Sequence, residues 1–325
     1  MNIINNPHDL IFKETMGDID VFKDFILNYL PEEVISKIDL NNIQIVKDSF
    51  VEKELKEIFS DLLYKTTIND QEGYIYFLFE HKSYPHKLIT IQLLKYILNI
   101  WELMVKQEKT EKLPVIVPLV IYHGKRKWTI GSKLLDIVRE VSEDFEKYIP
   151  DYQYILYDIS AFTDDQIKGE LKLRIFLELL GHIFKDDFEY KLKEILKLLD
   201  ELAKTKTDIE YFESVIRYIM SAKDDLSLSK LKKTVKKISI ERSEEVMTIA
   251  EKLRKEGKLE GKIEGKIEGI IEGIEIALEI KYGKEALTLM KDIRQIKDLD
   301  KIEGIKELIR EKSSFNEVKE VIFKH

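Results

Sequence analysis

Hydrophobic positions in the first third of the chain change from helical to strand spacing. Residues 7–30 carry an apolar stripe at helical spacing, interrupted near Gly17, which predicts two helices that end before Pro31. From residue 43 onward, β-branched and aromatic residues predict three strands, at 43–51, 61–68 and 74–79. The polar segment Asn69–Gly73 separates the last two strands, so we expect them to pair as an antiparallel hairpin.

Helices and strands continue to alternate up to Ser160. A long helix is predicted at 86–107, and further strands at 113–122 and 152–157. Beyond Ser160 the apolar spacing is helical, over 167–184, 187–204, 209–220, 246–253 and 284–290. This order predicts an α/β fold, in which helices pack on a mixed α+β sheet and an α-helical C-terminal region follows. We expect three regions, at 1–160, 161–245 and 246–325.

Residues 256–273 repeat the pattern glutamate, glycine, lysine or isoleucine, aliphatic residue. In a helix, the glycine stripe lies opposite the aliphatic stripe. Each glycine costs roughly 1 kcal/mol relative to alanine, and no glutamate–lysine pair has a stabilising spacing. A helix here therefore needs a packing partner. We expect the glycine face to pack closely on a second copy of the chain, giving a homodimer; the alternative is a flexible linker.

Composition excludes several classes of protein. The chain of 325 residues has no cysteine, which excludes disulfide scaffolds and thiolate metal sites and fits a cytoplasmic protein. No apolar run approaches the roughly 20 residues that a membrane span needs, and no signal peptide is visible. The net charge of −8 argues against coating nucleic acid by bulk charge.

Positive charge is nevertheless concentrated in one part of the sequence. Residues 106–133 contain seven lysine or arginine residues against two glutamates. Lys125, Arg126 and Lys127 follow a predicted buried strand, and positive charge at this position suits contact with a phosphate backbone. Ordinary solvated lysines in a lysine-rich chain are the alternative.

Asp61, Glu80 and Lys82 are the candidate chemical groups of the predicted hairpin. Glu80 and Lys82 are two residues apart on a strand and therefore share a face. If the hairpin is symmetrical about Asn69–Gly73, Asp61 falls opposite this pair. Two carboxylates suit a hard divalent cation, and the lysine suits phosphodiester cleavage. The alternative is a solvated strand end with a surface ion pair.

Several further motifs, which occur in order along the chain, make the interpretation of this trio more specific. They are Pro7-His8-Asp9, Phe59-Ser60-Asp61-Leu62-Leu63-Tyr64, Leu78-Phe79-Glu80-His81-Lys82-Ser83, Leu94-Lys95-Tyr96 with Trp101-Glu102, and Pro118–Gly124 with Trp128. Together they resemble the recombination-promoting nuclease (Rpn) family, also described as YhgA-like transposases, in the PD-(D/E)XK nuclease superfamily. Ser60 stands where the superfamily has a proline, in agreement with the Rpn form of the motif.

The resemblance implies a restriction-endonuclease-like catalytic core in residues 1–160, with helices on both faces of the sheet. It implies a metal-dependent DNA endonuclease in which Asp61 and Glu80 bind the metal and Lys82 serves catalysis. Mg²⁺ is the expected ion, with Mn²⁺ or Ca²⁺ as alternatives. Gln92 and Tyr96 resemble the Gln-x-x-x-Tyr element of RecB-like nucleases, and both share one helix face. An amphipathic helix edge is the alternative for this pair.

Two further residues have open interpretations. Asp9 is either a helix cap or an additional acid beside the metal. His123 is either a loop histidine bonded to backbone or a contact to phosphate or substrate.

The predicted function is DNA cleavage in recombination, mobile-element traffic or phage defence, with little sequence specificity. The alternatives are a catalytically inactive, nuclease-derived binding or regulatory protein, and a transposase. The presence of Asp61, Glu80 and Lys82 together favours the enzyme. We expect no interaction with a membrane.

Overall fold

The computed structural model describes residues 7–46, 62–80, 85–109, 111–140, 142–202, 205–223, 226–311 and 314–323, without the side chains of 78–80, 107, 108, 206 and 260. The chain forms two compact units, Asn6–Val246 and a second unit that contains Met247–His325. We call them the sheet unit and the C-terminal unit. In the described part of the chain, no helix is both long enough and apolar enough to cross a membrane.

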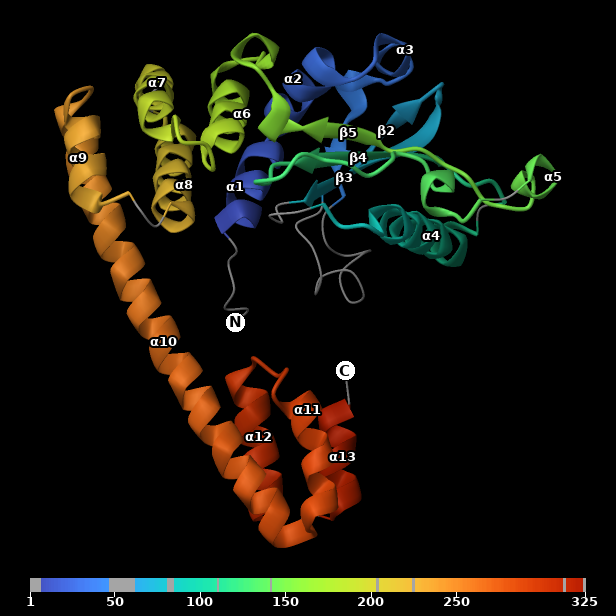
Figure 1. The fold of residues 1–325 in the computed structure, drawn as a ribbon, viewed down its shortest axis with the longest axis vertical. Helices are drawn as coiled ribbons and strands as arrows, with labels where there is room; N and C mark the ends of the chain where they lie inside the picture. The colour runs from blue at the N-terminus through green and yellow to red at the C-terminus, as the bar shows by residue number, and fades with distance from the viewer. Residues whose placement is uncertain are drawn as a thin grey trace. The chain divides into compact units, whose positions relative to one another are not determined.

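One mixed sheet of five strands, in the order β1-β2-β3-β4-β5, forms the centre of the sheet unit (Figure 1). The strands are β1 (Gln44–Ile45), β2 (Leu62–Ile68), β3 (Gln71–Glu80), β4 (Val115–Tyr122) and β5 (Ile155–Asp158). The first three pair antiparallel, whereas β3, β4 and β5 run parallel. The predicted α/β class with a mixed sheet is confirmed, and it is consistent with a restriction-endonuclease-like core.

The turn of the β2–β3 hairpin differs from the expected one. Asn69 and Asp70 form a two-residue turn with φ values of 51° and 61°, and Ile68 pairs with Gln71. Asparagine and aspartate tolerate this left-handed backbone, which suits tight hairpins. Gly73 therefore lies inside β3, and the predicted turn Asn69–Gly73 is wrong. The register shifts by three residues, so that Leu62 pairs with Phe77 and not with Glu80.

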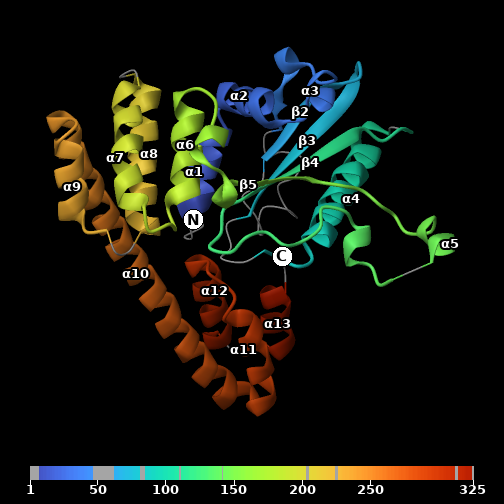
Figure 2. The same cartoon turned by 45° about the horizontal axis from the view of Figure 1, so that its top comes forward.

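Helices cover both faces of the sheet. Neighbouring residues of β3 point in opposite directions, so each helical layer packs on a different set of β3 side chains. On one face, the Phe77 ring lies 5.4, 5.7 and 5.3 Å from the rings of Phe12, Phe22 and Phe25, which come from α1 (Pro7–Met16) and α2 (Ile19–Tyr29). On the other face, Tyr76 packs in a cluster with residues of α4 (Ile89–Glu108). Figure 2 shows these two helical layers with the sheet between them.

The remaining helices of the sheet unit lie around this core or extend it. They are α3 (Glu32–Ile35), α5 (Glu143–Glu146), α6 (Leu171–His182), α7 (Phe188–Glu201), α8 (Lys206–Ala222) and α9 (Leu228–Lys236), with short 3₁₀ helices at η1 (Leu40–Asn42), η2 (Leu135–Ile137), η3 (Ile159–Ala161) and η4 (Asp164–Gln166). The expected break near Gly17 is present between α1 and α2, where the Asp18 side chain caps α2. Of the predicted strand 43–51, the described residues form only β1.

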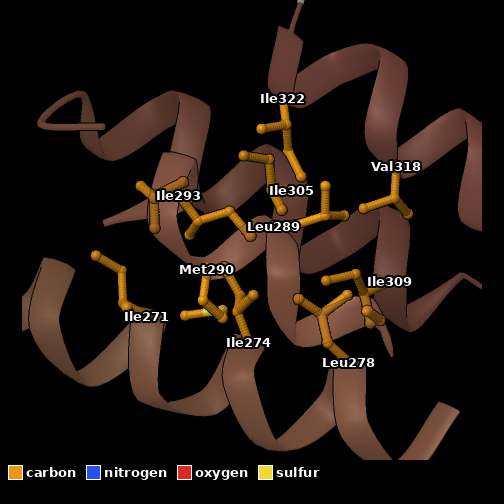
Figure 3. Packing of buried hydrophobic residues seen from close by; sticks show 12 residues of the cluster. Ile271, Ile274, Leu278, Leu289, Met290, Ile293, Ile305, Ile309, Val318 and Ile322 are labelled. Carbon is orange, nitrogen blue, oxygen red and sulfur yellow. The ribbon is translucent and has the colours of Figure 1, made fainter. Parts of the chain in front are cut away.

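The C-terminal unit is helical. Helix α10 (Ile240–Tyr282), whose first residues belong to the sheet unit, contains the four-residue repeat, so the repeat is a helix and not a linker. η5 (Lys284–Leu289), α11 (Met290–Ile293), α12 (Leu299–Arg310) and α13 (Phe315–Phe323) follow. Ile271, Ile274 and Leu278 of α10 are buried against these helices in one apolar cluster (Figure 3).

The glycine face of α10 has no such packing within the described residues. A Cβ atom added at Gly257, Gly261, Gly265, Gly269 or Gly273 would meet nothing within 4 Å. The support that a glycine-rich helix needs therefore comes from the aliphatic stripe, at least in the second half of the repeat. Burial of each isoleucine or leucine on that stripe stabilises the unit by about 1.5–3 kcal/mol.

Buried tyrosines make the sheet unit sensitive to alkaline pH. Burial raises the pKa of Tyr154 to about 12, and burial also raises the pKa of Tyr64 and of Tyr157. A raised folded-state pKa favours the neutral phenol, so the stabilisation is complete below the unfolded-state pKa near 10 and is lost as pH rises through the folded-state values.

We therefore predict that the free energy of unfolding in urea falls between pH 9 and pH 11, by up to about 1.4 kcal/mol for each buried tyrosine. Absorbance measurements at alkaline pH will show that these phenols ionise at a higher pH in the native protein than in urea. Tyr157→Phe will make the pH dependence less steep. Identical titration curves in native buffer and in urea would contradict the prediction.

Candidate functional site

The parallel strands β3, β4 and β5 end at one edge of the sheet. At this edge Glu80 of β3 pairs with Tyr122 of β4, and Tyr122 pairs with Asp158 of β5. The segments that follow parallel strands gather at such an edge, where open α/β sheets bind their ligands. The edge is therefore the candidate site of the sheet unit.

The predicted trio is only partly within the described residues. Asp61 and Lys82 lie outside them, and Glu80 is placed by its backbone as the last residue of β3. Their joint position stays a prediction. The register assumed for it is wrong, because the two-residue turn at Asn69–Asp70 moves β2 relative to β3.

Gln92 and Tyr96 both lie on α4, as expected. Tyr96 is buried, and its ring stacks on Tyr76 of the central strand with 5.2 Å between centroids. The Gln92 side-chain nitrogen is buried and has no hydrogen-bond partner in the described structure. A buried amide without a partner costs free energy, so Gln92 is available to a ligand group or to a water.

Asp9 and His123 occupy positions that the sequence left open. Asp9 lies in the first turn of α1, inside the helix, and not at its cap. His123 is fully buried next to the end of β4, and its ring lies 4.9 Å from His8 and 5.6 Å from Phe184. The Nδ1 atom of His8 lies 3.0 Å from the Tyr218 hydroxyl of α8. These contacts join α1, α8 and the end of β4.

Lys125, Arg126 and Lys127 are exposed in the segment after β4. The Lys125 ammonium lies 5.5 Å from the centroid of the Phe184 ring. The Tyr122 hydroxyl donates a hydrogen bond to the Arg126 carbonyl at 2.7 Å. The candidate DNA-contacting segment is thus held by a residue of β4, beside the carboxyl ends of the parallel strands.

Asp158 is a residue that the sequence analysis missed. It ends β5, and its Oδ2 accepts a hydrogen bond from the Trp128 backbone N–H at 3.1 Å. Its Oδ1 accepts a hydrogen bond from the Ser160 hydroxyl. An aspartate directly after the predicted strand 152–157 was the available signal. Asp158 fixes the far end of the basic segment.

A second group was also missed because it lies in the expected helical extension. Asp164 of η4 and Glu178 and His182 of α6 bring three potential ligand atoms within 4.8 Å of one another. The spacing of Glu178 and His182, four residues apart in a helix, was a visible signal.

Comparison with known proteins identifies the family. Residues 6–210 match the family model described as "Putative transposase, YhgA-like". The chain belongs to this family. The motif resemblance is thereby confirmed, and the matched region of this YhgA-like chain includes all the candidate residues discussed above.

Three bacterial relatives of this YhgA-like chain cover most of its length. It is 28% identical to the inactive recombination-promoting nuclease-like protein RpnE of Escherichia coli (strain K12), over 78% of this chain and 83% of the relative. It is 26% identical to the recombination-promoting nuclease RpnA of the same strain, over 78% and 85%. For the recombination-promoting nuclease RpnD of Escherichia coli O157:H7 the identity is 24%, over 77% and 94%.

No solved structure matches the chain significantly. The family and the named relatives support a nuclease or recombination role at the level of the family, although RpnE carries the name of an inactive protein.

Asp158→Ala tests the anchor of the basic segment. The change leaves the half-buried Trp128 N–H without its charged acceptor, so we predict a loss of about 1–3 kcal/mol in the free energy of unfolding. The tryptophan emission of the native protein will shift to the red as Trp128 becomes more exposed. Ser160→Ala keeps the Trp128 contact and serves as the control. An unchanged emission spectrum in Asp158→Ala would contradict this role.

Proposed function

We propose that this YhgA-like protein is a metal-dependent DNA endonuclease that hydrolyses phosphodiester bonds and so promotes recombination, mobile-element traffic or phage defence. The observation that carries the proposal is the position of Glu80. It ends the central strand β3 at the same edge as the basic segment after β4. The nuclease names of RpnA and RpnD give independent support.

In the proposed site, Asp61 and Glu80 hold a divalent cation. The donor set fits a hard ion such as Mg²⁺, with Mn²⁺ or Ca²⁺ as alternatives, because its donors are carboxylate oxygens. The bound ion supplies polarisation of a phosphoryl oxygen and a lowered pKa of a water. The unsatisfied amide of Gln92 supports a polar ligand on the α4 side of the site.

The other residues have roles that follow from their chemistry. The Lys82 ammonium orients the attacking water and stabilises negative charge on the phosphate. Gln92 positions a water or a phosphate oxygen by hydrogen bonding, and Tyr96 holds α4 against β3 through its stack on Tyr76. Lys125, Arg126 and Lys127 contact the DNA backbone without reading its sequence.

A binding protein without nuclease activity is the second candidate, favoured by the name of RpnE. A protein of this kind would bind DNA through the basic segment and would need neither Asp61 nor Lys82. A transposase would in addition join DNA strands, and the family description supports this third candidate.

Plasmid nicking by the full chain distinguishes these functions. We predict that the wild type nicks supercoiled plasmid with Mg²⁺ or Mn²⁺, and that chelation abolishes the activity. Asp61→Ala, Glu80→Ala and Lys82→Ala will each lower the rate by about a hundredfold or more, because each removes an electrostatic contribution to the transition state. Glu143→Ala, an exposed acid of α5, is the control.

Equal cleavage by the wild type and the three variants would refute the assigned site. Plasmid binding without cleavage under every metal would favour the binding protein, and transfer of a labelled DNA end into the plasmid would favour the transposase.

We further propose a homodimer through the C-terminal helices. The open glycine face of α10 supports it, since five glycines at successive repeats allow the backbones of two helices to approach closely. The glutamate and lysine stripes of one copy would then face the opposite stripes of the other.

Sedimentation of the full chain tests this dimer. We predict that the wild type is dimeric and that Gly261→Leu with Gly265→Leu shifts it to a monomer, since the added side chains occupy the packing face. Gly304→Leu in α12, where an added Cβ also meets nothing, is the matched control. In a monomer with a solvated glycine face, Gly265→Ala would instead stabilise α10 by about 1 kcal/mol. A monomeric wild type would contradict the proposal.

A further inference from the structure

The group formed by Asp164, Glu178 and His182 has the features of a metal site separate from the proposed nuclease centre. Asp164 comes from η4, and Glu178 and His182 come from one face of α6. One ligand atom of each residue lies within 4.8 Å of the other two. All three residues belong to the sheet unit, so their positions relative to one another are fixed by one compact body.

The buried imidazole of His182 has one ring nitrogen without a hydrogen-bond partner. His182 is only 4% exposed, and its Nδ1 lies 3.1 Å from Oδ1 of Asp187. A neutral imidazole that donates its Nδ1–H to a carboxylate presents Nε2 as an acceptor. Nε2 has no hydrogen-bond partner and lies 3.5 Å from Asp164 Oδ1 and 3.6 Å from Glu178 Oε2.

In that tautomer, three acceptor atoms from Asp164, Glu178 and His182 face one another, with the Lys191 ammonium 3.9 Å from Glu178 Oε2. Glu178 Oε2 is likewise buried and without a hydrogen bond. A cation at the centre of the group would stabilise the ionised carboxylate and use the lone pair of the imidazole.

The two distances from His182 Nε2 suit a small tetrahedral ion. Zinc bonds to nitrogen and carboxylate oxygen are about 2.0–2.2 Å long, which places tetrahedral ligand atoms about 3.3–3.6 Å apart. The two distances from His182 Nε2, 3.5 and 3.6 Å, agree with this spacing. A nitrogen ligand with two carboxylates favours Zn²⁺ over Mg²⁺, which prefers oxygen alone.

Lys191 of α7 provides positive charge beside the group. Its Nζ lies 2.7 Å from Asp164 Oδ2 and 2.9 Å from Glu194 Oε2, but 3.9 Å from Glu178 Oε2. The ammonium thus contacts the oxygen of Asp164 that faces away from His182, and Oδ1 is left for a metal. Glu194 still pairs with the Lys191 ammonium if that ammonium moves away from Glu178.

We propose that Asp164, Glu178 and His182 bind a zinc-class divalent cation, with Asp187 as the positioning residue of His182 and a fourth coordination position open to solvent. The Asp164 side chain is 61% exposed, which gives the ion a route of entry. The ion would join η4 to α6 and fix the segment that connects β5 to the helical extension. The site needs neither Asp61 nor Glu80 and is independent of the proposed nuclease function.

Metal titration of the full chain tests the site. The Asp61→Ala, Glu80→Ala double variant removes the proposed nuclease centre, and dialysis against a chelator removes bound metal. We expect calorimetry to show one Zn²⁺ bound per chain in this background, and Co²⁺ to give the visible absorption of a nitrogen- and oxygen-ligated ion. Zn²⁺ will also raise the unfolding temperature, because it binds only the folded site.

Matched variants in the same background assign the ligands. Asp164→Asn and His182→Gln are expected to weaken Zn²⁺ binding by about tenfold or more, and Asp187→Asn by about 10- to 100-fold. Asp165→Asn, the exposed neighbour in η4, will bind as the background does. Lys191→Met will bind Zn²⁺ more tightly, because it removes a like charge.

The proposal is overturned if the background variant takes up no Zn²⁺, or if Asp164→Asn binds Zn²⁺ as tightly as Asp165→Asn does. Because Asp164 is exposed, its substitution tests the site even if His182→Gln fails to fold. Nuclease assays are not needed for any of these results.

Discussion

The burial of β3 on both faces is the constraint on which the sheet unit depends. Phe77 points to the layer formed by α1 and α2, whereas Tyr76 points to the layer formed by α4. A strand of this kind is stable only when helices remove both of its faces from water. The parallel pairing of β3 with β4 also requires a crossover, and α4 provides it while covering one face.

This arrangement determines where chemistry can gather. Because β3, β4 and β5 run in the same direction, Glu80, Tyr122 and Asp158 occupy one register row at their carboxyl ends. Tyr122 and Asp158 hold the two ends of the basic segment, each through a backbone group. The framework thus places positive charge beside an acidic strand end, although the chain as a whole is acidic.

In the C-terminal unit, a glycine-rich helix has to be stabilised by its packing. Five glycines weaken α10, and the repeat offers no stabilising ion pairs within the helix. In the second half of the repeat, Ile271, Ile274 and Leu278 compensate by packing on the helices that follow. Lys266 pairs with Glu303 of α12 at 2.5 Å, but this exposed ion pair contributes little. Apolar burial is therefore the dominant support of this part of α10.

Local spacing in the sequence predicted the classes of element and several of their bounds. The helices on either side of Gly17, the hairpin and the strand that ends at Tyr122 all follow from periodicity, because side-chain direction within one element depends only on its own backbone. The glycine repeat was left open between a helix and a linker, and the structure shows the helix. The motifs that indicated the family are also short segments, so they too could be recognised before any fold was known.

Contacts between distant segments were decided by the tertiary structure alone. Spacing did not distinguish a turn at Asn69–Asp70 from one centred on Gln71, and the three-residue difference changes every cross-strand pair. The anchoring role of Asp158 and the meeting of Asp164 with His182 likewise depend on how β5 and α6 pack. The sequence determined which residues can carry charge and where strands and helices form. Only the fold decided which of those charges meet, because their meeting depends on packing between elements far apart in the chain.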